Sequence, residues 1–149
     1  MELIENDKIE NCVCEEVKEE EIEEMIQLGK EMIDFCSAKN AAGLSGPQIG
    51  VFKKIFVYKR TQDSYQIIFN PSYIRLSKKP IKVIETCLSY KENYIVERSK
   101  NIQAIYYTVK NNKLIKKGEE LSKEKAIYFQ HETDHLSGIT IRMIGKVNG

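Results

Sequence analysis

The segment His131-Glu132-Thr133-Asp134-His135 constrains this chain more than any other feature of its sequence. Residues four positions apart share one face of an α-helix, with Cβ atoms about 5–6 Å apart, so both imidazoles can reach one divalent metal ion. Glu132 lies one position round the helix, where its carboxylate can address a metal-bound water. The chain contains only two histidines, and both lie in this segment. A coincidental pair on a polar helix face is the alternative, and the spacing favours a metal site.

Two histidines leave such a site incomplete, because a catalytic metal usually takes three protein ligands plus water. The tail after His135 contains no His, Asp, Glu or Cys, so the third ligand must come from upstream. Cys87 is the best candidate, since it follows a predicted strand; a small buried core residue is the alternative interpretation. Cys12 and Cys14 lie in an acidic stretch, and Cys36 falls on the apolar side of a predicted helix.

The order of the predicted elements indicates the fold class. A length of 149 residues fits one domain, 1–149, that can bury a core without disulfides. Apolar spacing predicts a helix over 20–37 and a second helix from Leu121 to Leu136, which carries both histidines. Predicted strands cover 54–58, 65–69 (stopped by Asn70-Pro71), 81–84, 94–96, 102–110, 114–116 after a hairpin turn at Asn111-Asn112, and 139–144, with a loop over 40–50. Strands between one helix at each end predict an α+β fold with mainly antiparallel sheet.

Composition and charge exclude other classes of protein. No apolar run approaches the roughly 18 residues of a membrane span, and the acidic N-terminus resembles neither a secretory signal nor a transit peptide. Residues 1–34 carry a net charge of −10 and the rest +11, but the lysines are scattered and no RNA-stacking motif accompanies them. We therefore expect no direct nucleic-acid binding. Four cysteines without a Cys-x-x-Cys pair indicate a reduced, cytoplasmic setting.

Three segments together resemble the signature motifs of the peptide deformylase family, in the family's order. They are Gly43-Leu44-Ser45-Gly46-Pro47-Gln48, Glu85-Thr86-Cys87-Leu88-Ser89 and Gln130-His131-Glu132-Thr133-Asp134-His135. The resemblance covers roughly residues 20–145, and the third motif matches fully. This chain differs from the usual family pattern at Ala41 and Thr86 (usually Gly), at Ser45-Gly46 (usually two alanines) and at Tyr90-Lys91 (usually Val-Pro).

The resemblance implies antiparallel sheets that surround a central metal-binding helix. It implies a site in which Cys87, His131 and His135 bind the metal, Glu132 acts as the base, Gln48 and the backbone N–H of Leu88 stabilise the oxyanion, and Gly43 and Leu44 contact the substrate. The implied cofactor is one divalent metal ion, usually Fe(II) in the family, with Zn, Ni or Co able to occupy the same site.

The expected function is hydrolysis of the N-terminal formyl group from formylmethionyl peptides of nascent proteins, with the ribosome as an expected partner. Two alternatives stay open. A catalytically impaired deformylase-like protein would bind peptide N-termini without turnover, which the departures at the cleft motivate, Thr86 above all. A His-Glu-x-x-His zinc endopeptidase is the other, and the ligand-free tail counts against it.

Two further interpretations concern the surroundings of the motif. Ile127 and Tyr128 precede it by about one turn and fit either an apolar pocket for a methionine side chain or plain core packing. Asp134 is either a buried anchor paired with Arg98 or a surface ion pair of no consequence.

Overall fold

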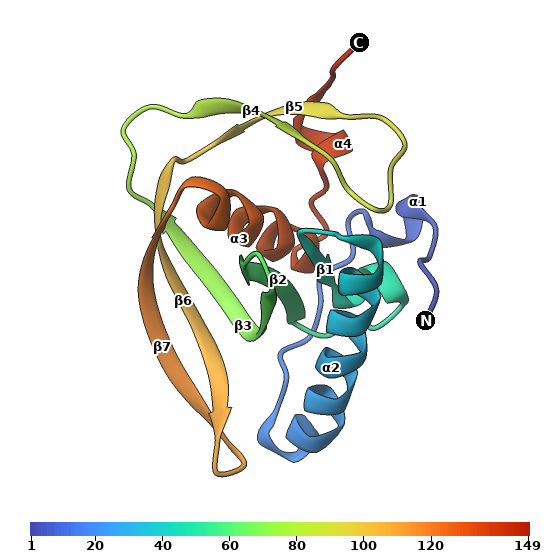
Figure 1. Cartoon of the computed structure of the whole chain (residues 1–149), viewed down its shortest axis with the longest axis vertical. Coiled ribbons are helices and arrows are strands. Elements are labelled where there is room, and N and C mark those ends of the chain that lie inside the picture. Colours follow the sequence, from blue (N-terminus) through green and yellow to red (C-terminus); the bar gives the residue numbers. More distant parts are fainter.

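Helix α3, Lys123–Leu136, lies at the centre of the computed structural model, which describes residues 1–149 (Figure 1). A five-stranded antiparallel sheet of order β1-β2-β3-β6-β7 curves around it, and a three-stranded antiparallel sheet of order β4-β5-β8 covers another side. The larger sheet comprises β1 Gly43–Ser45, β2 Ile55–Thr61, β3 Ser64–Arg75, β6 Asn101–Lys110 and β7 Lys113–Ser122; the smaller comprises β4 Ile81–Glu85, β5 Tyr94–Arg98 and β8 Lys146–Val147. The remaining helical segments are α1 Asn6–Ile9, α2 Ile22–Lys39, α4 Ile141–Ile144 and the 3₁₀ turns Glu19–Glu21 and Gly46–Ile49. The predicted α+β class, with antiparallel sheets around the histidine-bearing helix, is confirmed.

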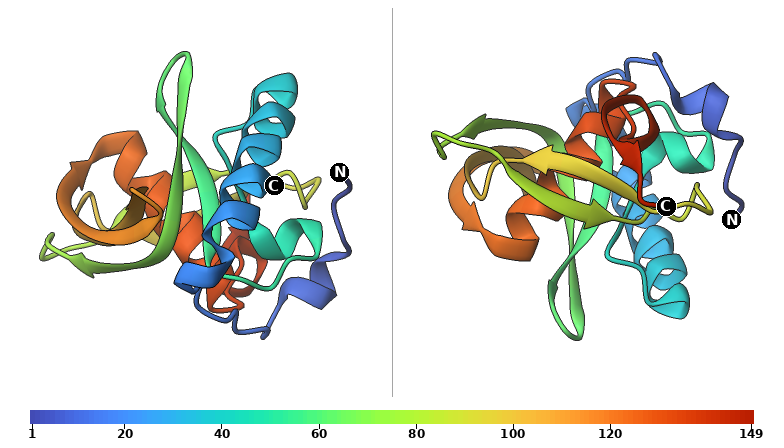
Figure 2. Two further views of the ribbon diagram at one scale, coloured as in Figure 1. Left: turned by 90° about the horizontal axis from the view of Figure 1, so that it is seen from below. Right: turned by 90° about the horizontal axis from the view of Figure 1, so that it is seen from above.

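A helix covers each face of the larger sheet, as Figure 2 shows, and the side chains of β2 point alternately toward one helix and the other. Phe56 and Tyr58 point toward α3, where Phe129 meets their rings edge-on at centroid distances of 5.3 and 5.8 Å. Ile55 and Val57 point the other way, into the apolar cluster that they form with the buried side of α2. Because side chains alternate across a strand, the four-residue run Ile55–Tyr58 supports both cores.

Helix α3 is buried on most of its circumference, which is unusual for so polar a sequence. Gln130, completely buried, fixes it to the β5–β6 corner: its side chain accepts from the Ser99 N–H at 3.0 Å and donates to the Ser99 carbonyl at 2.8 Å. His131, Glu132 and His135 are consequently held inside the protein, each less than 8% exposed. Buried polar side chains need hydrogen-bond partners, and the residues around α3 supply most of them.

Three boundaries differ from the sequence-based expectation. Strand β3 continues through Asn70-Pro71, because Asn70 adopts a left-handed conformation (φ 47°) at a bulge where proline needs no ladder hydrogen bond. Strand β7 runs to Ser122 as the long partner of β6, so α3 begins at Lys123. The expected loop over 40–50 contains strand β1 and a 3₁₀ turn.

The expected last strand over 139–144 is also wrong. Ile141–Ile144 forms the helical turn α4, with Ile141 completely buried against Tyr94 and Val96, and the strand that follows is Lys146–Val147. A short apolar run fits a helical turn as well as a strand, and packing decides between them. No helix of the structure combines the length and the apolar character that a membrane span requires.

Candidate metal centre and active site

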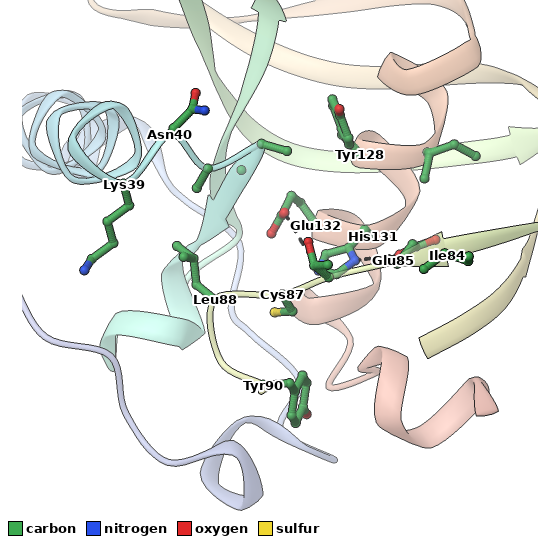
Figure 3. Close-up of a pocket in the computed structure, with 15 residues that line it drawn as sticks. Lys39, Asn40, Ile84, Glu85, Cys87, Leu88, Tyr90, Tyr128, His131 and Glu132 are labelled. Carbon is green, nitrogen blue, oxygen red and sulfur yellow. Dashed lines mark hydrogen bonds and ion pairs between the residues drawn. The ribbon is translucent and has the colours of Figure 1, made fainter. Parts of the chain in front are cut away.

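Three side chains of types that can bind a metal meet at one point, one from the segment after β4 and two from α3. The Cys87 Sγ atom and one nitrogen each of His131 and His135 all lie within 4.8 Å of one another, and Cys87 Sγ is 3.9 Å from His135 Nε2. Metal–ligand bonds of about 2.0–2.3 Å hold donor atoms roughly 3.5–4 Å apart in a tetrahedral site, so this set fits one metal ion. Figure 3 shows Cys87 and His131 grouped with Glu132.

The environment of Cys87 favours the thiolate, which is the form that binds metals. Burial alone would raise the pKa of its thiol, but interactions with His131 and His135 outweigh burial and lower this pKa to about 6. The other cysteines lie elsewhere: Cys14 and Cys36 are buried in the two large core clusters, where burial raises the pKa of each thiol to about 11 and 12.

Glu132 presents a free carboxylate oxygen to this cluster. Its side chain is 6% exposed, with Oε1 3.4 Å from His135 Nδ1 and Oε2 4.0 Å from His131 Nε2. Oε1 is buried without any hydrogen-bond partner in the chain. A buried acceptor left unpaired is costly, so this oxygen fits a site that receives a further polar group, such as a water beside a metal ion.

A buried charge network fixes the His131 ring. Glu85 Oε1 lies 2.7 Å from His131 Nδ1, so an N–H at Nδ1 leaves Nε2 free to face the donor cluster. Arg98, 1% exposed, donates to both oxygens of Glu85 at 2.7 and 3.0 Å and to Asp134 at 2.6 Å. Tyr73 donates to the second oxygen of Asp134 at 2.8 Å. The Asp134–Arg98 pair expected from the sequence is therefore a largely buried anchor.

Glu85 is the charged centre of that network. Burial alone would raise the pKa of its carboxyl, but hydrogen bonds from His131 and Arg98 outweigh burial and lower this pKa to about 2. The carboxylate is thus an ionised acceptor that holds the ring tautomer, as partners of metal-binding histidines commonly do.

Gln48 lies against the same cluster from the 3₁₀ turn Gly46–Ile49. Its side chain is 1% exposed, and Nε2 donates to Ser89 Oγ at 2.9 Å and to Cys87 Sγ at 3.4 Å. The backbone N–H of Leu88 takes part in none of the backbone–backbone hydrogen bonds of the chain. Two N–H donors, the Gln48 amide and the Leu88 backbone, therefore lie beside the candidate ligands, and neither is bonded to the main chain.

A pocket of about 600 Å³ opens onto Cys87, His131 and Glu132. Apolar and aromatic side chains from three parts of the chain line its walls, and Leu88 and Tyr128 are visible among them in Figure 3. The wall residues include Gly43, Ile84, Thr86, Leu88, Tyr90, Ile127 and Tyr128. Ile127 and Tyr128 thus line the pocket, as one of the two interpretations of their position predicted.

Most residues selected from the sequence gather here. Gly43 lines the pocket, whereas the Leu44 side chain is completely buried in the core, so only its backbone is available to a substrate. Sequence reasoning missed Glu85 as the partner of His131. Its place at the end of β4, two residues before Cys87, is the signal that was available, because residues i and i+2 of an extended segment share a face.

A family model described as polypeptide deformylase matches residues 4–146. The chain is 33% identical over 111 residues to a protein named peptide deformylase from Thermotoga neapolitana, a match covering 74% of this chain and 65% of that relative. It is 34% identical over 130 residues to a peptide deformylase from Fusobacterium nucleatum, covering 85% and 72%. A solved peptide deformylase structure from Thermotoga maritima superposes with a TM-score of 0.82 at 26% identity, covering 97% of this chain and 95% of that one.

Fold and site together define a candidate mononuclear metal centre of the His-Glu-x-x-His class, in which a cysteine that follows an earlier strand is the third potential ligand. The chain belongs to the polypeptide deformylase family. The alignment spans just under two thirds of the length of the Thermotoga relative.

Proposed function

We propose that this chain is a metal-dependent hydrolase that removes the N-terminal formyl group from formylmethionyl peptides. The single observation that carries the proposal is the unpaired, buried Oε1 of Glu132 beside the Cys87–His131–His135 set, where Glu132 also lines the pocket. A carboxylate that is not needed as a ligand, and that has no other partner, is available to move a proton.

The three ligands would hold a divalent ion that supplies Lewis acidity and lowers the pKa of water at this position toward about 7. Glu132 accepts the proton of the attacking water at its free oxygen and returns it to the methionine nitrogen as the formyl bond breaks. Gln48 Nε2 and the Leu88 N–H donate hydrogen bonds to the formyl oxygen as negative charge develops there. Glu85 and Arg98 keep the His131 ring oriented throughout.

The pocket suits the N-terminal methionine of the proposed substrate. Apolar walls that include Ile84, Leu88 and Ile127 accommodate a methionine side chain, and Tyr128 adds an aromatic face. Strand β1 is an edge strand of the larger sheet, so the backbones of Gly43 and Leu44 are available to pair with an extended peptide.

The proposal extends to the metal and the setting. A thiolate with two imidazoles suits Fe(II), with Zn, Ni or Co as alternatives whose occupancy depends on availability. The proposed substrates are nascent chains at the ribosome, and the proposed location is the cytoplasm, where the Cys87 thiol is kept reduced.

Release of formate from formyl-Met-Ala-Ser tests the proposal. The protein would be loaded in turn with Fe(II), Ni and Zn, with acetyl-Met-Ala-Ser as the control peptide. Formate released only from the formyl peptide supports deformylation. Binding of formyl-Met-Ala-Ser without formate release from any loaded form would favour the peptide-binding alternative, for which Thr86 in the pocket wall is the motive. Cleavage of an internal peptide bond would favour an endopeptidase.

A further inference from the structure

The Ser45 hydroxyl lies between a metal-binding histidine and the proposed oxyanion donor. Its Oγ is 2.9 Å from His135 Nδ1 and 3.1 Å from Gln48 Oε1. All three residues are at most 1% exposed, so no solvent competes for these contacts. The Ser45 backbone N–H also donates to Gln48 Oε1, at 3.0 Å.

These contacts fix the direction of every hydrogen bond. Because a backbone N–H can only donate, the Gln48 atom facing Ser45 must be the carbonyl oxygen, which can only accept. The Ser45 hydroxyl hydrogen therefore lies toward Gln48, and Ser45 Oγ is left to accept from His135. The proton of neutral His135 is accordingly on Nδ1, and the Nε2 lone pair faces Cys87 and the metal ligands.

The same hydroxyl keeps Glu132 free. Glu132 Oε1 lies 3.4 Å from His135 Nδ1, so it competes with Ser45 for the same N–H. Ser45 Oγ is nearer, at 2.9 Å, and Glu132 Oε1 consequently has no hydrogen-bond partner. Glu132 Oε1 is the next acceptor that the contacts of this chain offer to that N–H.

We infer that Ser45 is a positioning residue that orients His135 for metal binding, orients the Gln48 amide toward Cys87, and leaves the Glu132 carboxylate unpaired. The effects on Gln48 and Glu132 rest on the proposed function, whereas the effect on His135 rests only on the metal site. A purely local role is the rival explanation, because Ser45 and Gln48 also form the capping arrangement of the 3₁₀ turn.

Zinc affinity, measured by competition with a chromophoric chelator, tests the metal part. Ser45→Ala is expected to raise the zinc dissociation constant about 10–100-fold, the usual effect of losing the partner of a metal-binding histidine. Ser45→Thr retains the hydroxyl and is expected to stay near the parent. Thr133→Val is the matched control, because Thr133 lies between the ligands on α3 and its buried hydroxyl has no partner. Parental zinc affinity in Ser45→Ala would overturn the inference.

Formate release at saturating zinc tests the proposed effects of Ser45 on Gln48 and Glu132. Ser45→Ala is expected to lower kcat about tenfold or more with KM within about twofold, since the hydroxyl touches the machinery and not the pocket. An unchanged kcat would overturn the roles at Gln48 and Glu132. If the parent itself releases no formate, the proposed function fails, but the zinc measurement still decides the role at His135.

A spectroscopic measurement on the parent does not depend on any variant folding. In the zinc-loaded protein, NMR should show a slowly exchanging imidazole proton on His135 Nδ1 with cross-relaxation to the Ser45 β protons. A His135 ring proton that exchanges as rapidly as one open to water would contradict the hydrogen bond and, with it, the inference.

Discussion

Gly43 and Glu132 approach so closely that a Cβ atom on Gly43 would lie 2.6 Å from Glu132 Oε2. The same Cβ would lie 3.0 Å from the carbonyl oxygen of Val57, which the β1–β2 ladder holds in place. The carboxylate would therefore have to move rather than the strand. Gly43 thus contributes space, and this space determines where the proposed base sits.

Gly43→Ala is accordingly expected to displace Glu132 while leaving the ligands in place. A displacement of about 1 Å can cost about 10²-fold in rate, so kcat for formate release should fall by that order with metal content near one ion per chain. Gly118→Ala is the matched control, because a Cβ there meets nothing nearer than 3.4 Å and lies on β7. Parental kcat in Gly43→Ala would show that the position of Glu132 does not limit the rate.

Cys87→Ser is expected to weaken metal binding strongly, because it removes the thiolate of the donor set. The increase in dissociation constant should exceed the roughly 10–100-fold that loss of a ligand's partner causes. Zinc content after dialysis shows the loss of metal, and competition with a chelator measures the dissociation constant. Cys12→Ser, at a half-buried cysteine outside the donor set, should bind zinc as the parent does. Equal zinc binding by both variants would remove Cys87 from the site.

The sequence predicted the centre of this site better than its surroundings. His131, Glu132 and His135 follow from one local pattern on a helix. The ligand-free tail placed the third ligand upstream, and Cys87 was the best candidate there because it follows a predicted strand. Their meeting within 4.8 Å required only that one strand end reach one helix. The role of Ser45 depends on a contact between residues ninety positions apart, which no local pattern records.

The elements of the fold also fall into those that a local pattern predicted and those that depend on long-range packing. The hairpin at Asn111-Asn112 was predictable because both residues adopt positive φ, at 52° and 60°, as the two-residue turn requires. The helical turn at Ile141–Ile144 was not, because burial of Ile141 against β5 decides its conformation. Long-range packing therefore accounts for the wrong boundaries, and local backbone preference for the correct ones.

Glu10 provides a test of pH dependence away from the metal site. It accepts hydrogen bonds from Arg142, from Thr140 at 2.8 Å and from Tyr90 at 3.1 Å, and so ties the N-terminal segment to a pocket wall. The hydrogen bond from Arg142 is the largest cause that lowers the pKa of Glu10 below its ordinary 4.5. A carboxyl whose pKa is lower in the folded state stabilises the fold above pH 4.5, and that contribution is lost as the pH falls.

Glu10→Gln should therefore lower the free energy of unfolding at pH 7, and the difference from the parent should shrink steadily below pH 4.5. Urea unfolding at several pH values measures it. Glu16→Gln, at an exposed residue, should show no such difference at any pH. A difference between parent and Glu10→Gln that stays constant from pH 7 to pH 3 would mean that packing, not the charge of Glu10, accounts for it.

Glu132→Gln and Gln48→Ala separate proton transfer from charge stabilisation. Neither residue belongs to the donor set of Cys87, His131 and His135, so both variants should retain about one metal ion per chain. Glu132→Gln removes the proposed proton carrier and should lower kcat at least about 10²–10⁴-fold. Gln48→Ala removes one donor to the developing oxyanion and should lower kcat about 10²–10³-fold.

The control for both is Gln103→Ala on β6, which removes an amide far from the ligands and should keep parental kcat and metal content. Formate release at saturating substrate, with metal content measured on the same samples, gives the comparison. Metal loss in Glu132→Gln would make Glu132 a structural support of the ligands, because its carboxylate lies 3.4 Å from His135 Nδ1. Turnover at the parental rate in Glu132→Gln with metal retained would exclude Glu132 as the base, and the proposed hydrolytic mechanism would fail with it.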